Sequence, residues 1–247
     1  MPCTRFITVL VALVLASSAA TATDASLWRR LAQAAPAANP EAIRLAVTAM
    51  RCAVTHGVPS SRQLAIIDYS QSSTRKRLWI FDLASQRLLM RELVAHGRNS
   101  GGDLATRFSD KNGSLESSLG LYRTQNTYIG DNGYSLRLQG LDPGFNNHAL
   151  ERAIVIHGAA YVSNAFAQRE GRIGRSWGCP AVSTGVARRV IDTLKDGQFV
   201  FAYYPDQRWI GDSSLLHCDV AEHSVADATA RKGGQALLRT PDHAKLP

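Results

Sequence analysis

The spacing of hydrophobic residues predicts one amphipathic helix near the start of the chain. Asn39, Pro40 and Glu41 supply a capping side chain, a first-turn proline and an acid, which together are typical of a helix start. Gly57 is expected to end this helix. Its apolar face would consist of Ile43, Ala46, Val47, Met50 and Val54. Residues 23–38 are rich in alanine and carry little pattern, so we expect a linker there.

After this helix the pattern changes to short hydrophobic runs between loops rich in Gly, Ser, Asn and Asp, which predicts β-strands. The strands are expected at 64–69, 77–82, 87–95, 119–124, 134–138, 153–157 and 199–204. Residues 97–118 and 126–133 are expected to be loops, and a helix over 184–195 would be capped by Thr184 and ended by Gly197. Many strands and few helices predict a mainly β domain, a sandwich or partly open barrel with an N-terminal helix and one or two short peripheral helices.

The two ends of the chain differ from this β region. Residues 1–22 resemble a secretory signal peptide, with a basic start, an apolar run of 11 residues from Phe6 to Ala16 and small residues at the cleavage site. A run of this length is too short to span a bilayer, which takes about 20 residues. We therefore expect a periplasmic or secreted protein without a membrane span after cleavage. Residues 23–61 would be linker and helix, residues 62–210 the main domain, and residues 211–247 a mobile polar tail.

The chain is basic, with 28 Lys and Arg against 20 Asp and Glu. Loss of the signal peptide removes Arg5 and no acid, so the mature charge is 27 − 20 = +7. The basic residues are scattered, and no zinc-finger, helix-turn-helix or RNA-binding signature is present, so nucleic acid is not expected as a partner. The charge fits either ordinary solubility or affinity for an anionic polymer. We expect a monomer.

Three cysteines remain after signal cleavage, namely Cys52, Cys179 and Cys218. An odd number in an oxidising compartment leaves at least one thiol outside any internal bridge. In one arrangement Cys52 and Cys218 are bridged and Cys179 is free. In the other, Cys52 and Cys218 are both free and buried, because spacing alone does not define the geometry that a bridge needs.

Two motifs provide the parts of a cysteine nucleophile. Residues 174–182 read Gly-Arg-Ser-Trp-Gly-Cys-Pro-Ala-Val, so Cys179 lies in a tight turn between glycine and proline. His157 and Gly158 end the apolar run that precedes it. A thiol with an ordinary pKa near 8.5 is mostly protonated at neutral pH, and an imidazole can take its proton and leave a thiolate–imidazolium pair. Gly158 lets the backbone bend close to the histidine, so that a carbonyl there can orient the other ring nitrogen.

Neighbouring groups add to this chemistry. The N–H groups of Gly178 and Cys179 are candidates for an oxyanion hole, and Arg175 would lower the thiol pKa, bind a carboxylate or serve only a structural role. The competing interpretation of Cys179 is a small buried hydrophobic residue. A zinc site formed with His157, His217 and Cys218 is disfavoured by the adjacent positions of the last two, so we expect no metal and no cofactor. No Gly-x-Ser-x-Gly elbow of a serine hydrolase is present.

With these motifs the chain resembles the murein L,D-transpeptidase catalytic domain, in the branch that carries Gly-Arg-Ser-x-Gly-Cys-Pro-Ala-Val. The resemblance covers about residues 62–205, and it includes the strand-then-glycine element at 94–97 and an element resembling Thr-Pro-x-Gly-x-Phe at 117–122. Two departures stand out. Trp177 replaces the histidine that the family has before Gly-Cys, and the spacer between histidine and cysteine is 21 residues, long enough for a short helix and a loop over the cleft.

The resemblance implies a cysteine peptidyltransferase that acts on peptidoglycan stem peptides at the cell wall through a thioester acyl-enzyme. Its catalytic residues would be Cys179, His157, Gly158 and Gly178, and its substrate-binding residues Arg175, Ser176, Trp177, Tyr161 and His96. Trp177 and His96 have equally simple structural explanations. Two alternatives stay open: an L,D-carboxypeptidase or murein amide hydrolase that uses the same pair, and a non-catalytic wall-binding module.

Overall fold

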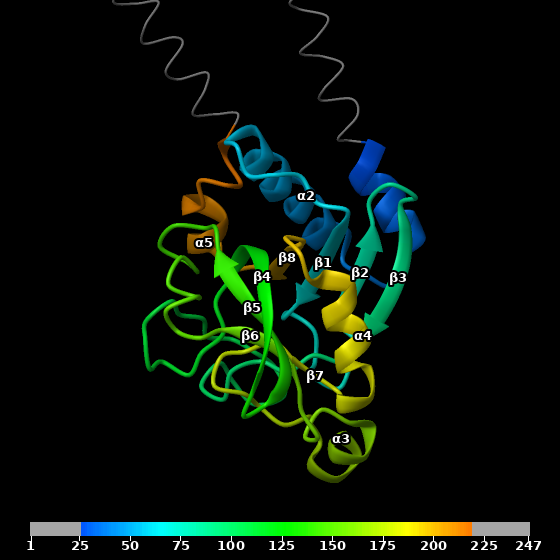
Figure 1. Cartoon of the computed structure of the whole chain (residues 1–247), viewed down its shortest axis with the longest axis vertical. Helices are drawn as coiled ribbons and strands as arrows, with labels where there is room; N and C mark the ends of the chain where they lie inside the picture. Colours follow the sequence, from blue (N-terminus) through cyan, green and yellow to red (C-terminus); the bar gives the residue numbers. More distant parts are fainter. Residues whose placement is uncertain (1–25, 219–247) are drawn as a thin grey trace, which may run out of the picture. The chain divides into compact units, whose positions relative to one another are not determined.

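Eight strands form one sheet in the order β3-β2-β1-β8-β4-β5-β6-β7 (Figure 1). The structure is a computed structural model, and it describes residues 26–218. The strands are β1 (Gln63–Asp68), β2 (Leu78–Asp82), β3 (Arg87–Glu92), β4 (Gly120–Gly130), β5 (Gly133–Gly140), β6 (Val155–Gly158), β7 (Ala181–Val182) and β8 (Phe199–Tyr203). The pairs β1–β8 and β6–β7 are parallel and the other neighbours are antiparallel. The expected mainly β, barrel-like fold with few helices is therefore confirmed.

Besides the helical residues 26–34, the sheet is accompanied by α2 (Pro40–Thr55), α3 (Asn164–Glu170), α4 (Thr184–Leu194) and α5 (Gln207–Asp212). The start of α2 is as predicted, because the Asn39 side chain accepts a hydrogen bond from the Glu41 N–H at 3.0 Å. α2 packs against β1, β4 and β8, whereas α4 packs against β6, β5 and β1. Figure 1 shows α3 at the end of the molecule away from α2.

Several boundaries differ from the sequence-based expectation. Residues 26–34 are helical and Leu31 is fully buried, so the linker interpretation is wrong for this stretch. The expected loop 126–133 is instead the β4–β5 hairpin, where Gly133 takes a positive φ of 73° at the turn. α4 is capped by Ser183 rather than by Thr184, which is its first residue.

The folded domain also continues beyond residue 210, where the mobile tail was expected to begin. Asp142 is buried and accepts hydrogen bonds from Trp209 Nε1 at 2.9 Å and from the Ser213 hydroxyl at 2.8 Å. These bonds attach α5 and the residues after it to the turn that follows β5, and the compact unit extends to Leu216. The signal peptide expected at 1–22 and residues 219–247 of the expected tail lie outside the described residues.

Backbone hydrogen bonds join the two ends of the sheet. The chain that follows β3 runs beside the chain that leads into β7, and we call these paired segments, residues 95–98 and 176–181, the seam. Its bonds are Ala95 N–H to Ala181 O (2.8 Å), Ser176 N–H to His96 O (3.0 Å) and Arg98 N–H to Ser176 O (2.7 Å). Because β3 and β7 are the outer strands of the sheet, the seam nearly closes it into a barrel.

The strands β5, β6 and β7 present two different faces, since side chains alternate along a strand. One face packs on α4: a Cβ added at Gly158 would lie 2.9 Å from Ala187 Cβ, so only glycine fits this close approach. Residues paired across strands lie on the same face. The face opposite α4 therefore carries Ser135 and Arg137 of β5, Val155 and His157 of β6, and Ala181 of β7.

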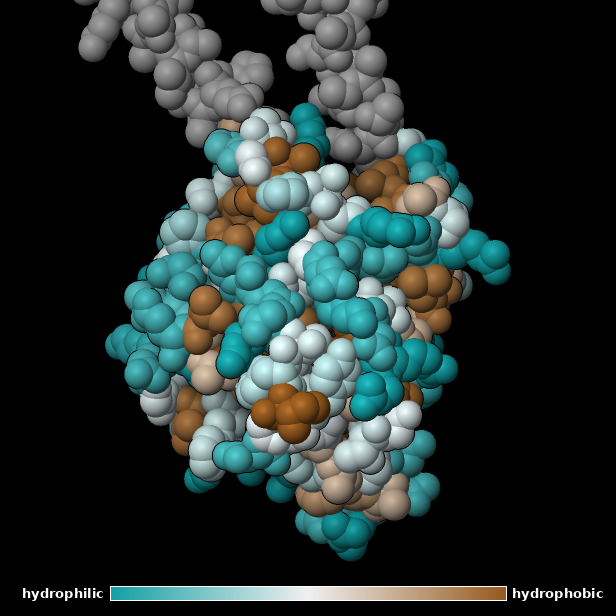
Figure 2. Space-filling view, in the orientation of Figure 1, coloured by the Kyte–Doolittle hydropathy of each residue, from teal (hydrophilic) through white to brown (hydrophobic). Residues whose placement is uncertain are grey.

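Hydrophobic side chains on the surface are scattered. On the face drawn in Figure 2 they form separate small patches among hydrophilic residues rather than one continuous surface. Trp177 is the most exposed tryptophan of the described residues, with 73% of its surface accessible. Within residues 26–218, no helix has the length and apolar character needed to cross a bilayer.

The seam generates a prediction for Gly97. A Cβ at this position would lie 2.4 Å from Leu115 O and 2.8 Å from Ser117 N, both of them backbone atoms that cannot move alone. We expect Gly97→Ala to lower the free energy of unfolding by about 2 kcal/mol through overpacking. Denaturant unfolding measures this, with Gly102→Ala as the control, because a Cβ at Gly102 would meet no atom within 4 Å. Equal stability of the two variants would contradict the packing of the seam.

Candidate active site

Cys179 is the free cysteine of the described residues, and it is partly exposed. Cys52 and Cys218 are disulfide-bonded, so the arrangement in which both are free is wrong. The Cys179 sulfur lies 3.8 Å from the Ala153 carbonyl oxygen. The surrounding protein atoms desolvate the thiol and raise its pKa, while a hydrogen bond from the Val155 N–H and the charge of Arg152 act in the opposite direction.

His157 lies at the end of β6 and is buried, with 4% of its surface accessible. Its Nδ1 is 3.0 Å from the carbonyl oxygen of Gly158. A carbonyl can only accept, so Nδ1 carries the proton and Nε2 is left as the acceptor. This is the orienting carbonyl that the sequence predicts at Gly158. Burial lowers the pKa of His157, and the Gly158 carbonyl partly offsets this effect.

The sheet register relates the histidine to the cysteine. His157 pairs with Ala181 in the parallel β6–β7 ladder. Cys179 precedes Ala181 by two residues, as Val155 precedes His157, so the register places Cys179 beside Val155. The hydrogen bond from Val155 to the sulfur agrees with this placement. With a period of two, Cys179 and His157 belong to the same face, one strand and two residues apart, which is about 8 Å between their Cα atoms.

The turn before Cys179 is held by the Ser176 side chain. Its hydroxyl donates to the Cys179 carbonyl oxygen at 2.6 Å and accepts from the Gly178 N–H at 3.1 Å. Ser176 is therefore a buried structural residue of the turn. Gly178 has φ +120°, a conformation that L side chains rarely adopt, and a Cβ there would lie 2.8 Å from Glu116 O. Among the hydrogen bonds of residues 26–218, none uses the N–H of Cys179 or Trp177.

Arg152 supports the turn from the side of the 97–118 loop. Its side chain is 3% exposed, and it lies 3.6 Å from Asp110. Its guanidinium donates to the Glu116 carbonyl oxygen at 2.7 Å, to Ser114 Oγ at 3.1 Å and to the oxygens of Ser109 and Ser118. Ser117 donates to the Gly178 carbonyl oxygen at 3.1 Å. The loop expected at 97–118 is thus bound tightly to the cysteine turn.

The candidate substrate-binding residues occupy different positions. Arg175 Nη1 donates to the carbonyl oxygens of Arg98 at 3.1 Å and Gly101 at 2.8 Å. One nitrogen of its guanidinium is therefore bonded to the 97–118 loop. Burial and the charges of Arg172 and Arg98 lower its pKa. Tyr161 is partly buried, and burial together with the charge of Cys179 raises its pKa to about 12.

The long spacer forms α3, the short helix that its length suggested, and then returns to the site. Ser163 caps α3, and Gly171 ends it with a φ of 69°. A Cβ at Gly174 would lie 2.4 Å from Tyr161 Cβ and within 2.6 Å of its ring, so glycine is needed to seat this tyrosine. Two residues before Cys179, the Trp177 ring is exposed. Tyr161 and Trp177 are therefore the aromatic side chains of this region.

His96 lies inside the protein, with 1% of its surface accessible. Its Nδ1 is 2.7 Å from Nη2 of Arg77, which is also buried, donates to the Val94 carbonyl oxygen at 3.1 Å and stacks over Tyr69. Because a guanidinium can only donate, Nδ1 must accept, and a doubly protonated ring is excluded from this contact. Burial and the charge of Arg77 lower the pKa of His96 to about 4. This environment favours a structural role.

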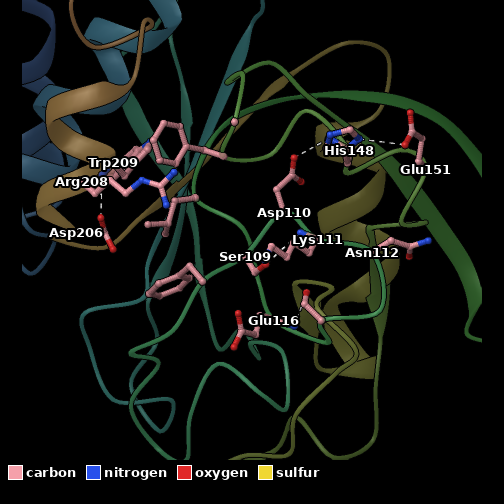
Figure 3. A pocket seen from close by; sticks show the side chains of 15 residues that line it. Ser109, Asp110, Lys111, Asn112, Glu116, His148, Glu151, Asp206, Arg208 and Trp209 are labelled. Carbon is pink, nitrogen blue, oxygen red and sulfur yellow. Dashed lines mark hydrogen bonds and ion pairs between the residues drawn. The ribbon is translucent and has the colours of Figure 1, made fainter.

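A larger and a smaller cavity are lined by residues of neighbouring segments. The larger, about 920 Å³, is lined by charged side chains of the loop, the turn after β5 and α5, and Figure 3 shows Asp110, His148 and Glu151 facing one another in it. Neither Cys179 nor His157 lines this cavity or the smaller one described next. A smaller cavity of about 490 Å³ reaches Ala153 and Val155, the two residues whose backbones contact the sulfur. We therefore relate the smaller cavity to the thiol.

Comparison with known proteins gives the class. The model of the L,D-transpeptidase catalytic domain matches residues 34–203, and the chain belongs to this family. The matched range includes α2, whereas the sequence pattern predicts a main domain that begins only at residue 62. No functionally curated protein matches the chain.

The similar solved structures have low sequence identity to this chain and low TM-scores. An L,D-transpeptidase from Mycobacterium smegmatis has a TM-score of 0.37 at 11% identity, covering 59% of this chain and 60% of its own. A fused Zn-dependent amidase/peptidase/peptidoglycan-binding domain-containing protein from Clostridium acetobutylicum has 0.35 at 16%, covering 67% and 62%. An L,D-transpeptidase from Mycobacterium tuberculosis has 0.35 at 14%, covering 59% of each chain. This chain thus spans about 60% of the length of these relatives.

Sequence reasoning missed Arg152 and Arg77. Arg152 is a single arginine before a hydrophobic run, and Arg77 is the last residue of the basic run Arg75-Lys76-Arg77, so nothing in the local pattern distinguishes either from a surface residue. Their roles arise from contacts with residues far along the chain, such as Arg152 with Glu116 and Arg77 with Val94. Ser117 lies in the 117–122 element that resembles the family. Its hydrogen bond to the Gly178 carbonyl oxygen joins segments far apart in the sequence, so it could be seen only in the folded structure.

The His96–Arg77 contact predicts an acid-sensitive stability. The folded pKa of about 4 lies below the ordinary 6.5, so between these values the unfolded chain binds a proton that the folded protein does not. The contribution to stability is complete above pH 6.5 and falls by about 3 kcal/mol as the pH drops to 4. We expect His96→Asn, which keeps an acceptor for Arg77, to flatten the pH dependence of unfolding in this window. The control is His148→Gln, an exposed histidine, and an unchanged slope in His96→Asn would refute the contact.

Proposed function

We propose that this protein is a cysteine peptidyltransferase that acts on peptidoglycan stem peptides. The observation that carries the proposal is the pairing of a free, accessible Cys179 with His157 on the same sheet face, with His157 Nδ1 bound to a carbonyl so that Nε2 can accept a proton. Membership of the L,D-transpeptidase catalytic-domain family supports the substrate class. The expected signal peptide supports action outside the cytoplasm, in the periplasm or at the cell wall.

The resting pair is neutral in this proposal. Burial raises the pKa of Cys179 and lowers that of His157, so both shifts disfavour a thiolate–imidazolium pair in the free enzyme. The thiol proton would move to His157 Nε2 as the sulfur attacks, which is general-base assistance. The attacked group would be the carbonyl of the third residue of a tetrapeptide stem. The proton returns to the amine of the leaving D-alanine, and a thioester to Cys179 remains.

The oxyanion would be held by the turn itself. The N–H of Gly178, one of the two expected donors, already bonds to the Ser176 hydroxyl. We therefore assign the oxyanion donors to the N–H groups of Cys179 and Trp177, and give Gly178 the role of shaping the turn through its positive φ. One donor of this kind lowers the barrier by about 3 kcal/mol.

The second step transfers the acyl group to an amine of another stem. His157 takes a proton from the attacking amine, the C–N bond forms, the C–S bond breaks and the thiol is regenerated, which gives a 3→3 cross-link. If water attacks instead, the product is a trimmed stem and the enzyme is an L,D-carboxypeptidase. Trp177 and Tyr161 are proposed to contact the substrate, because the first is exposed and the second packs against Gly174 of the cysteine motif.

The neutral resting pair predicts slow alkylation of Cys179 at neutral pH. We expect the rate with iodoacetamide to rise through the alkaline range with an apparent pKa above that of an ordinary cysteine, because burial disfavours the thiolate. Stopped-time mass spectrometry of the mature protein from pH 5 to 10 measures this. A rate that already reaches its plateau at pH 7 would show a preformed ion pair and contradict the neutral state.

The proposed reaction is tested by its products. We expect the purified protein to convert tetrapeptide muropeptides into 3→3 dimers, and Cys179→Ala to reduce this conversion by at least 1,000-fold, in line with loss of the nucleophile. Ser183→Ala is the control, because Ser183 lies close in sequence and its side chain forms no capping bond. Liquid chromatography with mass spectrometry separates dimers from trimmed monomers. If only trimmed monomers form, the reaction is hydrolysis and not transfer. Full activity of Cys179→Ala would contradict both the transpeptidase and the carboxypeptidase proposals.

A further inference from the structure

The smaller cavity is built on an irregularity of the sheet. Thr124 pairs with Leu138 and Thr127 with Leu136, so two residues of β4 oppose the single Arg137 of β5. This two-against-one arrangement is a β-bulge, a feature that re-aims side chains and is common next to active sites. The bulge brings two amides and a guanidinium to one cavity. We call the cavity the bulge pocket; its lining is Gln125, Asn126, Tyr128, Arg137, Leu150 and residues 153–155.

The bulge pocket shares two residues with the surroundings of the thiol, although Cys179 itself does not line it. Ala153, whose carbonyl oxygen is 3.8 Å from the Cys179 sulfur, lines it, and so does Val155, whose N–H bonds to that sulfur. Arg137 is the register partner of Val155. Arg137, Val155 and Cys179 therefore follow one another across the sheet on the face that carries His157. Two strand spacings separate the Arg137 and Cys179 Cα atoms, which is about 10 Å.

Arg137 is held in place and keeps its charge available. Its guanidinium carbon lies 3.9 Å from the centre of the Tyr128 ring. The ring is seated against Gly130, where a Cβ would lie 2.6 Å from Tyr128 Cε2. Among the ion pairs of residues 26–218 none involves Arg137. A stacked, partly buried guanidinium without a carboxylate partner is suited to bind a carboxylate with two parallel hydrogen bonds.

We propose that the bulge pocket binds the acyl-donor stem and that Arg137 pairs with a carboxylate on the side chain of its third residue. The proposal rests on the function proposed above and adds to it Arg137 as a specificity-determining residue. A side chain that ends in both an amine and a carboxylate can reach Arg137 across the distance of about 10 Å that the sheet sets. A lysine-type side chain offers no such carboxylate. Gln125 Nε2 donates to Gln139 Oε1 at 2.7 Å, which leaves its amide oxygen and the amide of Asn126 for the peptide groups of the stem.

Binding to an inactive protein tests the proposal directly. The probes are two tetrapeptides whose third residue is a diamino dicarboxylic acid, one with the side-chain carboxylate free and one with it amidated. Titration calorimetry gives the Kd of each for Cys179→Ala and for the double variant Cys179→Ala/Arg137→Gln. We expect Arg137→Gln to weaken binding of the free acid about 10-fold and to leave the amide unchanged, because only the acid forms the charge-assisted bonds.

The matched control is Cys179→Ala/Arg188→Gln. Arg188 also stacks on a tyrosine, Tyr134, at 4.9 Å, but it belongs to α4 on the opposite side of the sheet. Its loss should not change either Kd. Arg137→Lys keeps the charge without the fork and should restore only part of the affinity. Equal weakening of both peptides, no weakening of either, or no binding by the parent variant would each overturn the proposal.

Kinetics with the active protein separate this proposal from the function on which it rests. If wild type forms the thioester and Arg137→Gln forms it with unchanged KM, the function stands and the assignment of Arg137 fails. If wild type forms no thioester while Arg137-dependent binding of the free acid persists, the function fails and the pocket assignment stands. The expected result is an increase in KM of about 10-fold with a nearly unchanged kcat, which a purely structural role for Arg137 would not produce.

Discussion

The seam between residues 95–98 and 176–181 is the constraint on which the site depends. Its backbone hydrogen bonds join the two ends of the sheet, and the segment that carries them also carries Cys179, the proposed nucleophile. Cys179 is therefore held by the closure of the fold rather than by a free loop. Ser176 is bonded on both sides, through its backbone to the seam and through its hydroxyl to the cysteine turn, so it couples closure of the barrel to the geometry of the thiol.

Burial sets the electrostatics of the region. It raises the pKa of Cys179 and lowers the pKa of both His157 and His96, so the neutral forms are favoured at each position. The two histidines differ in what their Nδ1 faces. At His157 it faces a carbonyl, which leaves Nε2 as an acceptor, and at His96 it faces the Arg77 guanidinium, which makes the ring a structural acceptor. The same residue type thus serves as a candidate base in one place and as a support in the other.

Much of this could be predicted from the sequence, because local signals carried it. The strand pattern and the start of α2 rest on short motifs with a direct physical meaning. The Cys179–His157 pair rests on short motifs as well, and its catalytic role stays a prediction. The remainder depends on contacts between distant segments. The bulge opposite Arg137 cannot be recognised from the alternation of polar and apolar residues. The burial of Arg152 results from its contacts with the 109–118 segment. The helix at 26–34 was missed because alanine gives little contrast between faces.

Peptide mapping after incubation with a tetrapeptide stem tests the central claim most directly. Acid quenching of wild type, digestion and tandem mass spectrometry locate any covalent adduct on the chain. The account predicts one adduct, the donor stem without its terminal D-alanine, on the peptide that contains Cys179, and none in Cys179→Ala. An adduct on another residue, or turnover of the stem without any adduct on Cys179, would contradict it.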